Sequence, residues 1–347
     1  MKKFIYILIS LMFSALLFAN DTYFYMAGGQ LVPTKDGEVD IEMQEEVINI
    51  VLNAENYDIT VDFFFYNHGG DVSLEIGFPF FCEGIGGEGT ISDFKCWTND
   101  VETSYTDLPL DKKWSSNEPT AQENAYVRTI NFPSKKVTKT KITYKSTYGR
   151  SYGYIAKYLY GTGFSWKNAI GKMTVRIQNN FLFCCPSWLS LPEAGKMKRI
   201  NDNIWEGVYT NIEPENYTDC ITINLEDIFG DVGPKVMLKD RYFACSSPLK
   251  SENLFWYTKP QLRLLRNAIY AYNGYPFKSP DLIELFEEKS VDWGWYGGLG
   301  TPYPLDENFS EDKLSKIEKD NIRLILEEEN KLSLKFNTGG CFNNRGY

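Results

Sequence analysis

The spacing of hydrophobic residues changes once along the chain, and this change constrains the fold more than any other feature. From about residue 40 to 230, apolar side chains recur at every second position, as in strands that bury one face. From about residue 255 they recur every three or four positions, as in amphipathic helices. The sequence therefore predicts a mainly β protein with a small α module, in which an antiparallel β-sandwich-like domain precedes a short helical domain.

Six runs in the β region share the period of two. Their apolar positions are Ile48, Ile50 and Leu52; Val61, Phe63 and Phe65; Val72, Leu74, Ile76 and Phe78; Ile142 and Tyr144; Met173, Val175 and Ile177; and Ile221, Ile223 and Leu225. The turn sequence Asn67-His68-Gly69-Gly70 separates the second run from the third and predicts a hairpin between them. Residues 93–124 are polar without a clear period, which indicates a long loop.

The C-terminal region carries the start and stop signals of helices. Thr258 and Gln261 have the spacing of a capping box, and Gly274 is a typical helix stop. Ser279-Pro280 predicts the start of a second helix, and a third is expected over about 310–330. The expected organisation is a β domain over 20–230, a linker over 231–252, a helical domain over 253–330 and a tail over 331–347.

Residues 1–19 have the pattern of a secretory signal peptide. Lys2 and Lys3 precede an apolar stretch from Phe4 to Phe18, which is short for a transmembrane helix. Cleavage after Ala19 would leave Leu17 where a small residue is usual, so an uncleaved N-terminal anchor is the alternative. No later segment reaches about 18 apolar residues, so we expect an exported protein, periplasmic or extracellular, without a transmembrane segment in the mature chain.

The seven cysteines suit an exported protein. We predict one disulfide between Cys82 and Cys96, which flank a glycine-rich turn, and another between Cys220 and Cys245. For the adjacent pair Cys184-Cys185 three alternatives stand: a vicinal disulfide, two separate partners, or two small buried apolar residues.

Composition and motifs exclude several functions. With 36 basic and 46 acidic residues the net charge is −10, which disfavours binding to nucleic acid through charge. The one histidine, His68, excludes His-rich metal sites, and we interpret it as an exposed turn residue rather than a catalytic base. Residues 84–89 satisfy the pattern GxGxxG, but no helical period follows, so we interpret them as a hairpin loop. We expect neither a cofactor nor a metal site.

The helical region contains a pattern of residues that is typical of a known family. The residues that carry it are Leu265, Arg266, Asn267, Ile269, Tyr270, Ala271, Gly274, Tyr275 and Phe277, then Phe286, Trp295 and Tyr296, then Asp320-Asn321-Ile322. Over about 80 residues this pattern resembles the YARHG domain, a small extracytoplasmic module of bacteria. Tyr272 and Asn273 replace the Arg and His of the family signature, so any role of that pair does not carry over. The resemblance implies a binding or accessory domain of the cell envelope, found in some proteins beside peptidoglycan-active domains.

Much of 25–227 resembles, more weakly, a bacterial exported family known only as a domain of unknown function. The blocks that carry this likeness are 27–50, 61–67, 77–80, 161–177 and 212–225. That resemblance implies export and the domain boundaries, without an activity.

Aromatic residues make up 16% of the chain, and such rings stack on sugars or on apolar partner surfaces. We take Arg266, Tyr270, Tyr272, Trp293 and Tyr303 as candidate ligand contacts, while Arg266 has the alternative of bracing its helix against the next loop. The prediction is a non-enzymatic binding or structural protein of the cell envelope, with peptidoglycan or an envelope protein as partner. The alternative is an envelope glycan hydrolase that uses paired carboxylates.

Overall fold

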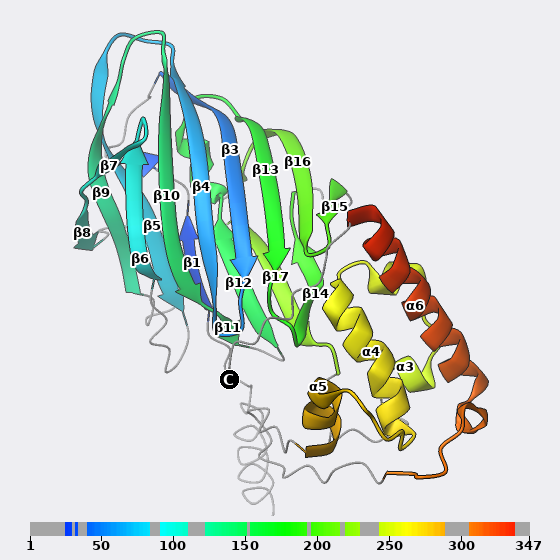
Figure 1. The fold of residues 1–347 in the computed structure, drawn as a ribbon. Helices are drawn as coiled ribbons and strands as arrows, with labels where there is room; N and C mark the ends of the chain where they lie inside the picture. The colour runs from blue at the N-terminus through cyan, green and yellow to red at the C-terminus, as the bar shows by residue number, and fades with distance from the viewer. Residues whose placement is uncertain are drawn as a thin grey trace, which may run out of the picture.

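A computed structural model gives the fold of the protein. It describes residues 25–29, 32–33, 40–83, 91–109, 122–150, 153–192, 196–215, 219–229, 243–288 and 305–336. Figure 1 shows two facing sheets and a group of helices beside one end of them. The predicted fold class, mainly β with a small C-terminal helical module, is confirmed.

The β domain is a sandwich of two sheets. Within the described ranges, sheet 1 has nine strands, in the order β14 (Cys184–Ser190), β17 (Cys220–Asp227), β12 (Tyr154–Leu159), β1 (Tyr25–Gly29), β5 (Val72–Glu83), β9 (Gln122–Phe132) and β8 (Thr106–Pro109), with β11 (Gly149–Arg150) beside β12 and β2 (Val32–Pro33) beside β5. Sheet 2 has eight, in the order β15 (Lys198–Asn201), β16 (Ile204–Ile212), β13 (Ile170–Asn179), β3 (Ile41–Leu52), β4 (Asn56–Asn67), β10 (Val137–Thr147), β6 (Ile91–Thr98) and β7 (Val101–Thr103).

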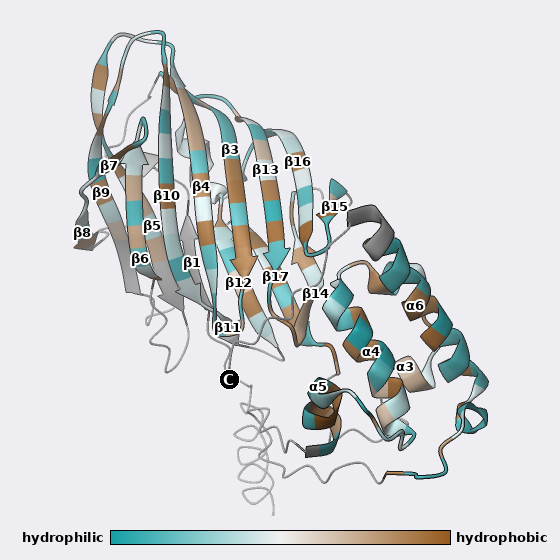
Figure 2. Cartoon of the chain, viewed as in Figure 1, coloured by the Kyte–Doolittle hydropathy of each residue, from teal (hydrophilic) through white to brown (hydrophobic). Residues whose placement is uncertain are grey.

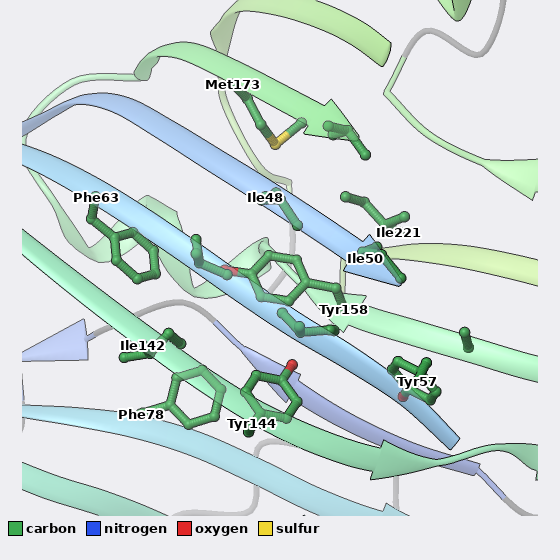
Figure 3. Packing of buried hydrophobic residues seen from close by; sticks show 14 of the residues in the cluster. Ile48, Ile50, Tyr57, Phe63, Phe78, Ile142, Tyr144, Tyr158, Met173 and Ile221 are labelled. Atoms are coloured by element: carbon green, nitrogen blue, oxygen red, sulfur yellow. The ribbon is translucent and has the colours of Figure 1, made fainter. Parts of the chain in front are cut away.

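The core lies between the two sheets. Along the strands of Figure 2, hydrophobic and hydrophilic residues alternate, as expected when one face is buried. In Figure 3, side chains from both sheets meet, among them Phe63 of sheet 2 and Tyr158 of sheet 1, both 0% exposed. Tyr158 donates its hydroxyl hydrogen to the buried carboxylate of Glu46 at 2.6 Å, which joins the sheets by a polar contact inside the core.

The predicted hairpin across Asn67–Gly70 is wrong. Strand β4 pairs with β3 and β10 in sheet 2, whereas β5 pairs with β1, β2 and β9 in sheet 1. The turn therefore carries the chain from one sheet to the other. The side chain of Asn67, 1% exposed, shapes this crossing, because its Nδ2 donates to the carbonyl oxygens of Gly70 and Phe132 at 2.7 and 2.8 Å.

One other expectation for the β domain needs correction. The predicted loop over 93–124 contains most of β6, all of β7 and β8 and the start of β9. Asp93 adopts a φ of 54° within β6, and the irregularity breaks the alternation of buried residues that a regular strand would show. The sandwich is mainly antiparallel, as predicted, and it also contains two parallel pairs, β3 with β13 and β1 with β12.

The three predicted helices are present. They are α4 (Lys259–Tyr272), α5 (Pro280–Ile283) continued by the π-helical turn η5 (Glu284–Glu288), and α6 (Lys316–Phe336). Shorter helical segments accompany them: η1 (Gly161–Ser165) in the β domain, then α3 (Phe243–Ser246), η4 (Ser251–Leu254) and η6 (Glu311–Lys313). Ala244 and Cys245 of α3 belong to the buried core of the helical module, so the part of the predicted linker that forms α3 packs with the helices.

The ends of α4 form as the sequence predicts. Thr258 Oγ1 accepts from the Gln261 N–H at 3.4 Å, and Gln261 Oε1 accepts from the Thr258 N–H at 2.9 Å. At the other end Gly274 has a φ of 79°, while its N–H and that of Tyr275 donate to the carbonyl oxygens of Ala271 and Tyr270. This is a Schellman motif, which glycine favours because a Cβ is strained at positive φ.

The helical module docks on the edge of the sandwich that β14 and β15 form, as Figure 1 shows. Gln261 Nε2 donates to the carbonyl oxygens of Phe181 and Cys184 at 2.9 and 2.7 Å. On the β15 side, Arg199 donates to the Tyr257 carbonyl oxygen at 2.8 Å and stacks on the Trp205 ring. Burial lowers the pKa of Arg199 to about 10. The two domains are therefore joined by buried polar contacts as well as by apolar packing.

Candidate binding site

A pocket of about 250 Å³ lies where strands β12, β14 and β17 run side by side in sheet 1. Side chains of β17 alternate, and Ile221, Ile223 and Leu225 point into the core with 0% exposure. Asn224 and Glu226, at the alternate positions, therefore point to the outer face of the sheet, where they line the pocket. The site is thus on the face of sheet 1 that sheet 2 does not cover.

Trp188 is the prominent side chain of the pocket, with 55% of its surface exposed. A β-bulge places it there, since Pro186 pairs with Leu225 and Trp188 with Asn224, so Ser187 is the extra residue. Ser187 Oγ donates to the Asn224 carbonyl oxygen at 3.3 Å. Proline lacks an N–H and suits an edge strand such as β14, where the bulge also disfavours pairing with another chain.

Gly153 forms another part of the pocket lining, beside β17. A Cβ at this position would lie 2.2 Å from the Leu225 carbonyl oxygen, so the backbones approach more closely than any other residue allows. The backbone of Gly153 therefore packs directly against the backbone of β17 at Leu225.

The pocket combines a large flat ring with hydrogen-bonding groups. Trp188 offers an apolar face and an indole N–H, Asn224 an amide, and Glu226 a carboxylate. An apolar ring face together with amide and carboxylate groups suits a ligand with one apolar face and hydroxyl groups at its edge, such as a sugar ring. Sequence reasoning did not select Trp188. The available signal was Pro186 inside a strand, which indicates an edge strand or a bulge.

Three of the predicted ligand contacts of the helical module, Arg266, Tyr270 and Tyr272, lie on α4. Arg266 on α4 forms an ion pair with Glu329 on α6 at 3.2 Å, with side chains 22% and 13% exposed, so it braces the two helices. Tyr270, half-buried, donates its hydroxyl hydrogen to Glu311 at 3.4 Å, and burial raises the pKa of its hydroxyl. Tyr272 is 8% exposed and packs in the core of the module. Trp293 and Tyr303 lie outside the described residues.

Asn273, which stands where the family signature has a histidine, makes structural contacts. Asn273 Nδ2 donates to the Ile269 carbonyl oxygen at 2.8 Å and to Glu318 Oε1 at 2.9 Å. Glu318 is 0% exposed, and its other oxygen accepts from the Ser315 N–H at 2.7 Å in the capping box of α6. In this chain Asn273 therefore links the end of α4 to the start of α6.

Neither predicted disulfide is present. Cys96 and Cys220, one member of each predicted pair, are free thiols, while the side chain of Cys82 lies outside the described residues. Cys96 is in β6 of sheet 2, where its Sγ donates to the Thr103 carbonyl oxygen at 3.2 Å, and Cys82 is in β5 of sheet 1. Cys220 belongs to the β domain and Cys245 to the helical module.

The adjacent cysteines follow the third alternative, two small buried residues. Cys184 is 2% exposed in the sandwich core and Cys185 is 6% exposed in the core of the helical module, and neither belongs to a disulfide. Burial raises the pKa of the Cys185 thiol to about 12, so it stays protonated at neutral pH.

His68 lies in the turn between the sheets with 33% of its side chain exposed. Its Nε2 is 2.7 Å from Glu42 Oε2, and its ring packs edge-on against Tyr66. These contacts tie the turn to β3. In the described part of the chain, His, Cys, Asp and Glu do not gather in groups of three or more that could hold a metal ion.

Comparisons with known proteins extend this picture. Residues 242–330 match the family model of the YARHG domain. The helical module is therefore confirmed as a YARHG domain. Its match starts at residue 242, just before α3, and so includes the part of the predicted linker that packs with the helices.

Among solved structures, the chain is similar to a Legionella pneumophila protein described as a "putative nutrient binding protein", with 20% identity, a TM-score of 0.49, and coverage of 89% of this chain and 99% of that one. It is also similar to an M1 zinc metallopeptidase of Deinococcus radiodurans, with 9% identity, a TM-score of 0.29 and 55% of this chain covered. This chain spans 45% of that metallopeptidase. A comparison with curated proteins found no match.

No helix of the described residues is long and apolar enough to cross a membrane.

Proposed function

We propose that this chain is an exported, non-enzymatic binding protein of the bacterial cell envelope, and that its β-sandwich binds a cell-wall glycan at the Trp188 pocket. The observation that carries this proposal is an exposed indole ring, placed by a bulge beside the amide of Asn224 and the carboxylate of Glu226. Stacking a sugar face on this ring would remove apolar surface from water while the sugar hydroxyls keep hydrogen-bond partners.

Export is supported by the pattern of residues 1–19 and by the YARHG domain, a module typical of exported bacterial proteins. The net charge of −10 means that an anionic wall polymer would not be attracted by charge alone. Contacts made by an aromatic ring and by hydrogen bonds are less sensitive to salt than ion pairs. The proposal therefore predicts that binding persists at high salt.

The test is co-sedimentation of residues 20–347 with purified peptidoglycan sacculi at low and high salt. We expect the protein to pellet at both, and Trp188→Ala to stay in the supernatant. Trp97→Ala is the matched control, because Trp97 is a half-buried tryptophan on sheet 2 that packs against Lys141. Absence of pelleting by the parent protein would refute glycan binding.

A Trp293→Ala, Tyr303→Ala double variant completes the experiment. If this variant loses binding while Trp188→Ala keeps it, the site belongs to the YARHG domain and the Trp188 assignment is refuted. Measuring soluble sugar released from the sacculi in the same tubes tests the hydrolase alternative, since a binding protein releases none.

A further inference from the structure

An arginine is buried inside the sandwich at the edge far from the YARHG domain. Arg128 on β9 is 6% exposed, and its Nη1 donates to Thr103 Oγ1 of β7 at 3.3 Å. The guanidinium therefore reaches from sheet 1 to sheet 2. Its Nε and Nη2 are buried and have no hydrogen-bond partner among the described residues. Burying a cation without such partners is unfavourable, so this arrangement calls for a further group that accepts hydrogen bonds.

Arg128 has no carboxylate partner among the described residues. Burial lowers its pKa, and an electrostatic interaction and a side-chain hydrogen bond with Cys96 oppose this effect. An arginine nevertheless stays protonated in proteins, so the interior holds a positive charge. The Cys96 thiol donates to the Thr103 carbonyl oxygen at 3.2 Å.

Hydroxyl groups surround this end of the core. Those of Thr98, Thr138 and Thr140 are buried and have no hydrogen-bond partner within the described ranges. Thr98 and Thr140 are directly opposite each other in β6 and β10, so their side chains share the inward face of sheet 2. Thr98 is two positions from Cys96, on that same face. The unsatisfied hydroxyls therefore lie on the part of sheet 2 toward which the guanidinium points.

These groups share one chemical property, since each of them can donate a hydrogen bond. Two N–H groups of a cation and the hydroxyls of Thr98 and Thr140 need an acceptor that also carries negative charge. A water molecule would accept some of these bonds but would leave the charge uncompensated.

We infer that a small inorganic anion of chloride size binds between the sheets, held by Arg128 from sheet 1 and by Thr98 and Thr140 from sheet 2. The ion links the outer strands of the sandwich, β6 and β10 on one side and β9 on the other. It stabilises the β domain more as the halide concentration rises, with the logarithmic dependence of any ligand that binds only the folded state.

The direct test is a crystal structure of the protein soaked in bromide, which scatters anomalously and replaces chloride. We expect an anomalous peak within hydrogen-bond distance of Arg128 and the Thr140 hydroxyl. Ordered water at that position, or a carboxylate of the chain paired with Arg128, would overturn the inference.

A solution test uses the melting temperature of the intact protein in sodium chloride and in sodium gluconate at equal ionic strength, because gluconate is too large for the site. We expect the melting temperature to rise with chloride and not with gluconate. Thr140→Val, which keeps the shape and removes the hydroxyl, should reduce the chloride effect, and Arg128→Met should abolish it. Arg176→Met, which removes a half-exposed arginine paired with Glu206, is the control and should keep the effect. Equal melting temperatures of the parent protein in both salts would refute the site.

Discussion

Gln261 carries the polar contact between the two domains, and its replacement tests how they are held together. The side chain is 0% exposed and makes three hydrogen bonds, one within the capping box of α4 and two to the sandwich. Methionine has nearly the same length and shape but cannot replace these bonds. Gln261→Met therefore removes polar contacts while it leaves the packing almost unchanged.

The loss of stability in Gln261→Met depends on which hydrogen bonds each partner of Gln261 retains. The Thr258 N–H loses its partner, which costs about 1–3 kcal/mol for a buried donor. The Cys184 carbonyl oxygen still accepts from Asn179 at 2.9 Å, and the Phe181 carbonyl oxygen still accepts a bond at 3.4 Å, so each loses about 0.5–1.5 kcal/mol. We expect the free energy of unfolding to fall by about 2–6 kcal/mol.

Urea unfolding followed by far-ultraviolet circular dichroism measures this change. Gln178→Met on β13 is the matched control, because that half-exposed glutamine contacts the exposed Asn180, and its replacement should cost at most about 0.5 kcal/mol. If the two variants lose the same stability, Gln261 does not anchor the YARHG domain and the argument from its hydrogen bonds fails.

Three further changes probe contacts inside the YARHG domain by the same unfolding assay. Glu329→Gln should cost about 1–2 kcal/mol, because it leaves the largely buried Arg266 without its charged partner; no loss would mean that the pair does not brace α4 against α6. Gly274→Ala should cost about 1 kcal/mol because of the φ of 79°, and an unchanged stability would contradict the Schellman assignment. Arg263 holds the pKa of Asp281 below its ordinary value of 3.8, so the pair stabilises the fold above about pH 4 and loses this effect as the pH falls through the lowered pKa. Asp281→Asn should therefore weaken the protein at neutral pH and flatten the acid side of its stability profile, and an identical profile would show that the pair is screened by water.

Local signals in the sequence predicted the local parts of the fold. The period of two identified the strands whose side chains form the core, because each strand buries one face and alternation is a property of the strand itself. The same holds for α4, whose cap at Thr258 and stop at Gly274 depend on residues within a few positions. These features need no knowledge of distant contacts.

Pairing between strands could not be predicted in the same way. The turn after Asn67 has hairpin residues, yet its strands belong to different sheets because Asn67 bonds to Phe132, which is 65 positions away in sequence. The parallel pairing of β3 with β13 likewise depends on long-range contacts. The Trp188 pocket was missed for a related reason, since the bulge that exposes the ring arises from the pairing of β14 with β17.

The last prediction concerns coupling between the YARHG domain and the proposed glycan site, and it rests on that proposed function. Strand β14 carries both elements, because the Cys184 carbonyl oxygen accepts from Gln261 and Trp188 follows four positions later. Since β14 is the edge strand of sheet 1, one side of it has no neighbouring strand to fix the bulge, and the contact from α4 holds its first residue.

Gln261→Met should therefore weaken binding to sacculi by about threefold to tenfold, which corresponds to about 0.7–1.4 kcal/mol, even under conditions where the variant remains folded. A sedimentation titration against Gln178→Met measures the effect. Equal affinities of the two variants, with binding intact in the parent, would show that the YARHG domain stabilises the sandwich without shaping its site. A parent protein that does not bind at all would instead refute the proposed function itself.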